Sequence, residues 1–236
     1  MGQYQKNRNI FFIKFRDWNL KLYNKFVSNP PYLDSDKVFP ENKILEENWM
    51  VIKDEINSIL EKANSMPKFH DVDDGQEFIS DNDGIAWNLF LVKTYGFWNK
   101  HNTKLCPNIV KLFKPLKNVT SISISFLSPG KHIPPHNGPY KGILRYQLAI
   151  SVPKEGNCQL FVDNKPYSWV EGKGVTFDDT YVHEVRNETK ETRVAVLLDI
   201  KRYDFPFLLR VYDFIFYKII QLLVILNRTM SKSAVK

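Results

Sequence analysis

The sequence predicts a mainly β fold with flanking helices, arranged as a small sandwich or jelly roll. From residue 119 onward, short β-rich runs alternate with Gly, Pro and Asn-Lys turns, which is typical of closely spaced antiparallel strands. Upstream of residue 119, apolar residues recur at helical spacing. With 236 residues and 43% hydrophobic content, the chain can bury one sizeable core.

Composition and periodicity divide the chain into four segments. Residues 1–30 form a basic amphipathic N-terminal segment, and residues 31–118 form a helical and loop region that flanks the core. The β-rich core spans residues 119–203, and residues 204–236 form an amphipathic helix with a basic tail. No internal repeat is present, which favours a single unit with attachments.

Two helices are expected within the flanking region. Trp49, Ile52 and Ile56 recur at helical spacing, and residues 105–113 resemble a short helix with Pro107 near its first turn. The strands of the core are expected in the stretches TSISISFL, GILRYQLAISV, CQLFVDN, KPYSWVEG, GVTFDD, HEVRNE and TRVAVLLDI. We expect the helices of the first half to flank this roll.

The net charge of +7 belongs to the two ends of the chain, which are also rich in apolar residues. In the last segment, one apolar stripe follows helical spacing: Leu208, Val211, Ile215, Ile219, Leu222 and Leu226. A basic amphipathic helix suits the surface of an anionic membrane, which it would contact peripherally. The alternative is that both ends are ordinary helices packed on the core. The longest uncharged run, Ile219 to Asn227, is too short to span a bilayer, which needs roughly 20 apolar residues.

The two cysteines, Cys106 and Cys158, offer neither a disulfide framework nor a thiolate zinc site. A reducing, cytoplasmic setting is therefore expected, at the cytoplasmic face of a membrane if the basic ends bind there. No nucleic-acid partner is expected, and the oligomeric state is left open.

Alternation gives three core strands one wholly apolar face and one face that carries polar residues. Ser125, Gln147 and Arg193 lie on these polar faces, and Arg145 shares a face with Gln147. If the polar faces line a shared interior, the two guanidinium groups need anionic partners, because a buried unpaired charge is costly. A dicarboxylate ligand would supply one.

Two histidines are candidates for holding a metal ion. We expect His136 in the loop before one strand and His183 at the start of another. Imidazole is a good ligand for divalent iron, and two histidines from neighbouring strands match a non-haem oxygenase site with open positions. Either histidine alone is explained as a hydrogen-bonded loop residue, but the pair, each followed by an arginine on the next strand, favours the metal.

Residues 121–202 resemble the aspartyl/asparaginyl β-hydroxylase family of Fe(II)- and 2-oxoglutarate-dependent dioxygenases. The resemblance consists of H-x-G-P at 136–139, an L-R-x-x-L strand at 144–148, E-G-x-x-x-x-F-D-D-x-x-x-H-E-V at 171–185, and an arginine ten residues after the second histidine. Upstream, NPPYLD, NWMVI and LCPNIVKLF resemble the bacterial lipid A acyl-chain hydroxylases of the same family. The resemblance implies a double-stranded β-helix core.

The resemblance also implies roles for individual residues. His136 and His183 would be the iron ligands, and Arg193 would pair with the distal carboxylate of 2-oxoglutarate. Ser125 would hydrogen-bond that same carboxylate, and O2 would take an open position on the iron.

Two further strand residues, Arg145 and Gln147, would face the cosubstrate or the substrate near the metal. Relatives often have histidine at the position of Gln147. The third ligand of a facial triad usually stands two residues after the first histidine, and this position is Gly138 here. Protein-hydroxylating members of the family carry glycine there and lipid A hydroxylases carry aspartate, although a turn with positive φ would also explain a glycine.

Other residues near these motifs have simpler explanations. Asp178 and Asp179 could reach the metal, but turn capping accounts for paired aspartates before a strand. Glu184 should point to the face opposite His183, and His132 is expected to form a hydrogen bond within a loop. Trp87 would either flank the substrate entrance or lie in the core.

The family resemblance therefore implies an Fe(II)- and 2-oxoglutarate-dependent hydroxylase. Its expected target is an unactivated carbon of an Asp or Asn residue in a polypeptide. One alternative target is the acyl chain of a membrane lipid, which the basic and apolar ends of the chain favour. Another alternative is a metal-binding β-roll without catalytic activity.

Overall fold

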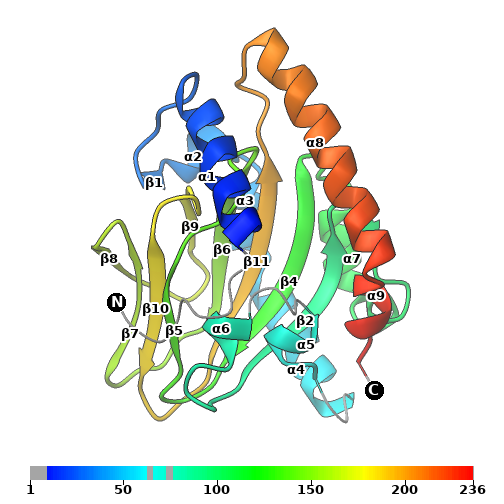
Figure 1. Ribbon diagram of the computed structural model, residues 1–236. Helices are drawn as coiled ribbons and strands as arrows, with labels where there is room; N and C mark the ends of the chain where they lie inside the picture. Colours follow the sequence, from blue (N-terminus) through cyan, green and yellow to red (C-terminus); the bar gives the residue numbers. More distant parts are fainter. Residues whose placement is uncertain (1–9, 63–65, 73–76, 236) are drawn as a thin grey trace.

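Two antiparallel β-sheets face each other and form the centre of the molecule (Figure 1). The computed structural model describes residues 10–62, 66–72 and 77–235. The strands are β1 (Tyr32–Leu33), β2 (Trp87–Thr94), β3 (Phe97–Trp98), β4 (Val119–Leu127), β5 (His132–His136), β6 (Ile143–Ser151), β7 (Asn157–Val162), β8 (Lys165–Ser168), β9 (Gly174–Phe177), β10 (His183–Glu188) and β11 (Arg193–Lys201). The helices are α1 (Ile10–Asn24), α2 (Ser35–Val38), α3 (Asn42–Glu47), α4 (Trp49–Lys62), α5 (Phe69–Val72), α6 (Glu77–Ser80), α7 (Pro107–Phe113), α8 (Phe207–Leu226) and α9 (Thr229–Lys232), with a 3₁₀ turn at Asn102–Lys104.

The strand order confirms the predicted jelly roll. The large sheet has the order β1-β9-β6-β11-β4-β2-β3, and the small sheet has the order β5-β10-β7-β8. From β4 onward the chain crosses repeatedly between the two sheets, so that most neighbours within each sheet are not consecutive in the sequence; β7 and β8, which form a hairpin, are an exception. This crossing is the topology of a jelly roll.

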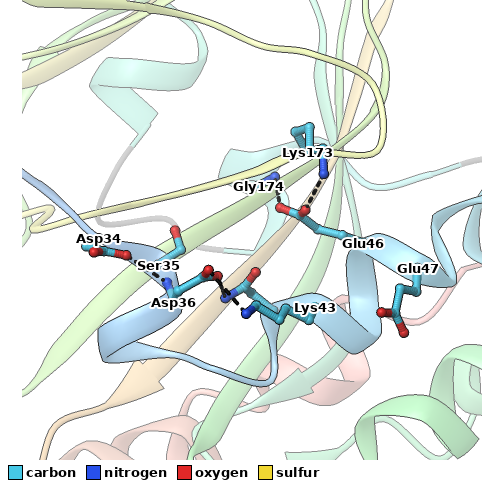
Figure 2. Close-up of a pocket in the computed structure, with 9 residues that line it drawn as sticks. Asp34, Ser35, Asp36, Lys43, Glu46, Glu47, Lys173 and Gly174 are labelled. Carbon is cyan, nitrogen blue, oxygen red and sulfur yellow. Dashed lines mark hydrogen bonds and ion pairs between the residues drawn. The ribbon is translucent and has the colours of Figure 1, made fainter.

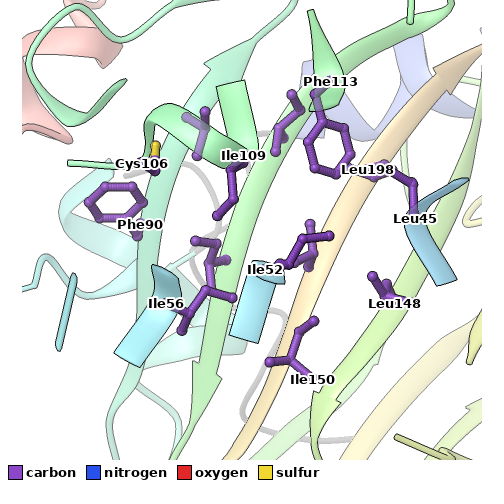
Figure 3. Close-up of a cluster of buried hydrophobic side chains, with 14 of the residues drawn as sticks. Leu45, Ile52, Ile56, Phe90, Cys106, Ile109, Phe113, Leu148, Ile150 and Leu198 are labelled. Atoms are coloured by element: carbon purple, nitrogen blue, oxygen red, sulfur yellow. The ribbon is translucent and has the colours of Figure 1, made fainter. Parts of the chain in front are cut away.

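The outer face of the large sheet is closed by helices (Figure 3). Ile52 and Ile56 of α4 and Phe113 of α7 pack there on Leu148 of β6 and Leu198 of β11. These side chains are fully buried, and burying each one contributes roughly 1.5–3 kcal/mol. The apolar faces predicted for the core strands are therefore the faces covered by helices.

The inner face of the large sheet points toward the small sheet and is mixed in character. Leu127, Ala149 and Val175 contribute to a buried apolar cluster that also includes residues of the small sheet. Arg193 and Ser125 lie on the same face and are also buried. The predicted polar faces thus do line a shared interior.

Four strands, β1, β2, β3 and β5, occur where no strand was expected, and β2 and β5 are the longest of them. Strand β2 lies in the region predicted to be helix and loop; it is buried along nearly its whole length, and a strand buried on both faces shows no alternation in its sequence. Strand β5 contains Pro134 and Pro135 but lies at the edge of the small sheet, where a missing N–H is tolerated. His132 and His136 are therefore the first and last residues of a strand, not loop residues as predicted.

The orientation of helix α8 differs from an ordinary packed helix. The buried residues of this helix are Leu209, Asp213 and Tyr217, whereas the predicted apolar stripe faces solvent. Its members Leu208 and Leu226 are 80% and 65% exposed. The face of α8 that packs on the core therefore consists of aromatic and aliphatic side chains around the buried Asp213 carboxylate. In the described part of the chain, no helix combines the length and the apolar character that crossing a membrane requires.

Candidate functional site

His136 and His183 are cross-strand neighbours at one end of the small sheet. His136 ends β5 and His183 begins β10, and the two residues are paired in the antiparallel register. Their ring centroids lie 4.2 Å apart, and the His183 ring also contacts Phe177 at 5.4 Å. The pairing of edge strand β5 with β10 thus brings together two imidazoles that are 47 positions apart in the sequence.

Backbone carbonyls determine the tautomer of both rings. Nδ1 of His136 lies 2.8 Å from the Pro134 carbonyl oxygen, and Nδ1 of His183 lies 2.9 Å from that of Tyr181. A carbonyl oxygen only accepts, so each Nδ1 donates and the lone pair of the neutral ring is on Nε2, as in metal-ligating histidines. Burial and the neighbouring His136 ring hold the pKa of His183 well below its usual value, which favours the neutral form that binds metals.

Within the residues that the structure describes, no carboxylate completes a triad with the two histidines. Among the described residues, no group of three or more His, Cys, Asp or Glu side chains could hold a metal ion. Gly138 occupies the position two residues after His136, but its φ is not positive, so a turn of that kind does not explain the glycine. A Cβ atom at Gly138 would lie 2.6 Å from the carboxylate of Asp179, and the Gly138 N–H donates to the Asp179 carbonyl oxygen at 2.7 Å. The Asp179 side chain thus occupies the space that any side chain at position 138 would need.

The two aspartates of the FDD motif differ in their roles. Asp178 accepts hydrogen bonds from the backbone N–H and hydroxyl of Thr180, which confirms the predicted turn capping, and it pairs with Lys141 at 3.1 Å. Asp179 makes no such cap and faces Arg145 at 3.4 Å. Burial raises the pKa of Asp179 to about 7, although Arg145 acts in the opposite direction.

His132 and Glu184 bind each other and not the histidine pair. Nε2 of His132 lies 2.7 Å from the Glu184 carboxylate, which also accepts from Arg186 at 2.8 Å. His132 thus makes a hydrogen bond, as predicted, although it does so from a strand and not from a loop.

Arg193 is buried and has no carboxylate partner in the described part of the chain. It is 1% exposed, and its guanidinium lies 4.6 Å from the centroid of the Trp169 ring and beside the Cys158 thiol. Its Nε and Nη1 have no hydrogen-bond partner among the residues that the structure describes. Burial lowers the pKa of Arg193 to about 10. An anion placed here would offset the desolvation cost of this charge, which is several kcal/mol for an unpaired buried ion.

Arg145, on the same inner face, is paired within the chain. Its Nε lies 2.8 Å from Asp199, and its Nη2 lies 3.4 Å from Asp179. Both arginines were expected to need anionic partners. The protein itself supplies such partners to Arg145 but not to Arg193 in the described part of the chain.

Ser125 and Gln147 are buried on the inner face between these arginines. The Ser125 hydroxyl accepts a hydrogen bond from Nε1 of Trp87 at 2.9 Å, so its own hydrogen remains available for donation. Trp87 stacks on Phe69 at 4.0 Å and is buried, which places it in the core and not at an entrance. The Gln147 side-chain oxygen has no hydrogen-bond partner in the described part of the chain.

The sequence analysis predicted no role in this inner region for three residues that lie there: Cys158, Trp169 and Asp199. Trp169 and Cys158 contact the guanidinium of Arg193, and Asp199 pairs with Arg145. Asp199 shares its strand face with Arg193, which was the available signal. Nothing in the sequence near Trp169 indicates that its ring contacts Arg193, which lies 24 positions away.

A separate surface hollow of about 470 Å³ lies between α2, α3 and the start of β9 (Figure 2). Glu46 accepts from Lys173 and from the Gly174 N–H, both at 2.9 Å, and Asp36 lies 3.4 Å from Lys43. These charges neutralise one another at the surface. The hollow contains none of the candidate site residues.

The chain also resembles proteins of known sequence. The model of the family described as aspartyl/asparaginyl beta-hydroxylase matches residues 46–203. An ornithine lipid ester-linked acyl 2-hydroxylase of Rhizobium tropici is 33% identical over 192 residues, which cover 80% of this chain and 67% of that protein. The aspartyl/asparaginyl beta-hydroxylase of Homo sapiens is 30% identical over 195 residues, which cover 78% of this chain but 24% of that protein.

Similarity to solved structures is weaker. A 2OG-Fe(II) oxygenase family oxidoreductase from Burkholderia pseudomallei aligns with a TM-score of 0.38 at 12% identity, covering 54% of this chain and 72% of that one. A Cupin_2 domain of a transcriptional regulator from Enterobacter cloacae aligns with a TM-score of 0.32 at 17% identity, covering 38% of this chain and 87% of that one. The family model covers more than half of the chain and includes both histidines and Arg193. The chain therefore belongs to the aspartyl/asparaginyl β-hydroxylase family.

Proposed function

We propose that this protein is an Fe(II)- and 2-oxoglutarate-dependent hydroxylase. The observation that carries this proposal is Arg193, a buried guanidinium with no carboxylate partner in the described chain, on the inner face of a roll that also holds a pair of neighbouring histidines. One end of a dicarboxylate would neutralise this charge. Bound iron would supply the activation of O2, coupled to conversion of 2-oxoglutarate to succinate and CO2.

The residues present fit these ligands. Nε2 of His136 and Nε2 of His183 would hold the iron, because both Nδ1 atoms already donate to carbonyls. Arg193 and the Ser125 hydroxyl would hold the distal carboxylate of the cosubstrate. With Gly138 next to the Asp179 carboxylate, the third protein ligand of a facial triad would be replaced by water. The surrounding apolar cluster would exclude bulk water from the reacting centre.

The test is succinate formation in the presence of Fe(II), 2-oxoglutarate and substrate. Chelation of the metal should abolish turnover. His136→Ala should lower turnover by more than about 100-fold, because even the loss of a group that merely orients a metal ligand costs 10- to 100-fold. His132→Ala is a matched control on the same strand and should retain turnover.

Metal affinity provides a second readout that does not depend on activity. Titration with Mn(II), followed by the paramagnetic resonance of the free ion, should show weaker binding to His136→Ala than to His132→Ala. Full turnover by His136→Ala would show that the ligand assignment is wrong. Binding of metal and 2-oxoglutarate without succinate release from any substrate would favour the non-catalytic β-roll.

For the substrate, we propose the acyl chain of a membrane lipid. The R. tropici relative is named for such a reaction, and the exposed apolar face of α8 is suited to contact with lipid. A polypeptide Asp or Asn residue is the second candidate, because Gly138 matches the protein-hydroxylating members of the family. Mass spectrometry of a membrane lipid extract and of a peptide mixture, each incubated with enzyme, would distinguish them. Gain of one oxygen atom by peptides alone would overturn the lipid proposal.

A further inference from the structure

Helix α8 leaves a continuous apolar face in solvent. Six side chains on this face are between 45% and 80% exposed: Leu208, Val211, Ile215, Ile219, Leu222 and Leu226. Helix α1 lies beside α8, with Phe15 against Phe216 at 5.8 Å and Trp18 against Tyr212 at 6.4 Å, and both Phe15 and Trp18 are themselves exposed. Single exposed leucines are normal on a protein surface, but a contiguous patch of this kind marks an interaction site. We call these eight residues the docking face.

Hydrogen bonds between the opposite side of α8 and the core fix the orientation of the helix, so that the docking face points to solvent. The Asp213 carboxylate is buried and accepts hydrogen bonds from the hydroxyls of Tyr23 at 2.8 Å and Tyr140 at 2.7 Å. One turn later Tyr217 is buried, and Gln221 donates to the Tyr95 carbonyl oxygen at 2.8 Å. If α8 rotated to bury its apolar stripe, Asp213 would lose the hydrogen bonds from both tyrosine hydroxyls. A buried carboxylate without hydrogen-bond donors is unfavourable. The exposure of the stripe is thus a built feature of the fold.

The charges around the docking face are predominantly positive. Arg210 and Lys218 of α8 are exposed, and the helix contains no acidic residue except the buried Asp213. On α1, Lys14 and Lys21 are exposed, and the acidic residue in the described helix, Asp17, is paired with Arg16 at 2.7 Å. The patch therefore combines hydrocarbon with positive charge.

We infer that the docking face binds the surface of an anionic lipid bilayer. Exposed apolar side chains, an interfacial tryptophan and flanking cations match the two attractions that hold a helix in the plane of such a surface. A second copy of this chain fits less well, because a symmetric contact would bring the same cations together, and like charges repel across an interface.

The position of α1 connects this surface to the candidate site. Arg16 donates to the Asn137 side-chain oxygen at 3.1 Å, and Asn19 donates to the Pro139 carbonyl oxygen at 3.2 Å. Helix α1 thus rests on the loop that directly follows His136. A bilayer on the docking face would lie against the same helix. The inference goes beyond the proposed function and does not require it, because docking needs neither iron nor cosubstrate.

Vesicle sedimentation of the full chain tests the inference. The chain should bind vesicles of equal parts phosphatidylglycerol and phosphatidylcholine, bind phosphatidylcholine vesicles more weakly, and be released as salt rises. Ile215→Glu combined with Leu222→Glu should weaken binding by about 10-fold or more, since each exposed side chain contributes apolar area. Val170→Glu, at an equally exposed apolar residue outside the docking face, is the matched control and should bind normally.

Two further measurements keep the test decisive. Circular dichroism should show the double variant folded, so that weaker binding reports on the surface itself. Vesicle binding should shift the tryptophan emission to shorter wavelength, and Trp18→Phe should reduce this shift. Equal binding to both vesicle types, insensitivity to salt, or normal binding by the folded double variant would overturn the inference. The inference would also be overturned if the chain did not bind vesicles but formed a dimer, and if Ile215→Glu combined with Leu222→Glu dissociated that dimer.

Discussion

The surroundings of Arg145 and Arg193 differ sharply, although both arginines lie on the inner face of the large sheet. Arg145 is paired with two carboxylates, Asp199 and Asp179, at 2.8 and 3.4 Å. Arg193 is more deeply buried and has an aromatic ring and a thiol instead. Replacing an unpaired buried charge with an apolar side chain removes its desolvation cost. Removing one member of a buried ion pair lowers stability, because the other charge is then left uncompensated. We therefore expect the region around Arg145 to contribute to stability and, under the proposed function, the region around Arg193 to bind the cosubstrate.

The largest effect is expected at the paired arginine. Arg145→Met should lower the free energy of unfolding by about 3 kcal/mol, because it leaves two buried carboxylates without their cation. Urea denaturation would measure the loss. Adding Asp199→Asn should restore part of it, since one of the uncompensated charges is then removed. If Arg145→Met unfolded at the same urea concentration as the unmodified protein, the ion pairs of Arg145 would not contribute to stability, and its surroundings would not differ from those of Arg193 in this respect.

The corresponding change at Arg193 should weaken cosubstrate binding without lowering the stability of the fold. Arg193→Met should raise the KM for 2-oxoglutarate by at least about 30-fold, which is the usual minimum for truncating one side of a buried charge pair. The melting temperature without ligands should stay the same or rise, because an unpaired buried charge is replaced by a side chain of similar length. Calorimetry and succinate release measure the two quantities. A strong loss of stability with an unchanged KM would show that Arg193 is a structural residue.

A smaller effect on cosubstrate binding is expected at Ser125. Ser125→Ala should raise the KM for 2-oxoglutarate by about 3- to 10-fold, the value of one hydrogen bond. Trp87→Phe is its control, because it removes the hydrogen bond to Ser125 and leaves the serine hydroxyl in place. If Trp87→Phe raised the KM as much as Ser125→Ala, the serine would be acting only through its bond to the tryptophan.

Much of the roll and of the site could be predicted from local patterns. Period-two alternation separated Tyr146, Leu148 and Ile150 from Arg145 and Gln147, and the structure confirms both faces. The jelly roll and the family followed from the β-rich texture and from motifs around His136 and His183. The metal and cosubstrate roles of these residues remain predictions that the variants above address.

Other features depended on contacts between distant parts of the chain. The prolines of β5 argue locally against a strand, but β5 lies at a sheet edge where they are tolerated. The glycine at position 138 makes space for the carboxylate of Asp179, which lies 41 positions away and cannot be inferred from turn preferences.

The sequence by itself determined which residues of each strand share a face, because the pleat of a strand imposes a period of two on any side chain. It also determined the apolar stripe of α8, because the helical repeat is equally local. Only the tertiary structure decided where that stripe points and which arginine has a partner. Those outcomes depend on Asp213 meeting Tyr23 and Tyr140, and on Asp199 meeting Arg145, which are encounters that only the folded chain brings about.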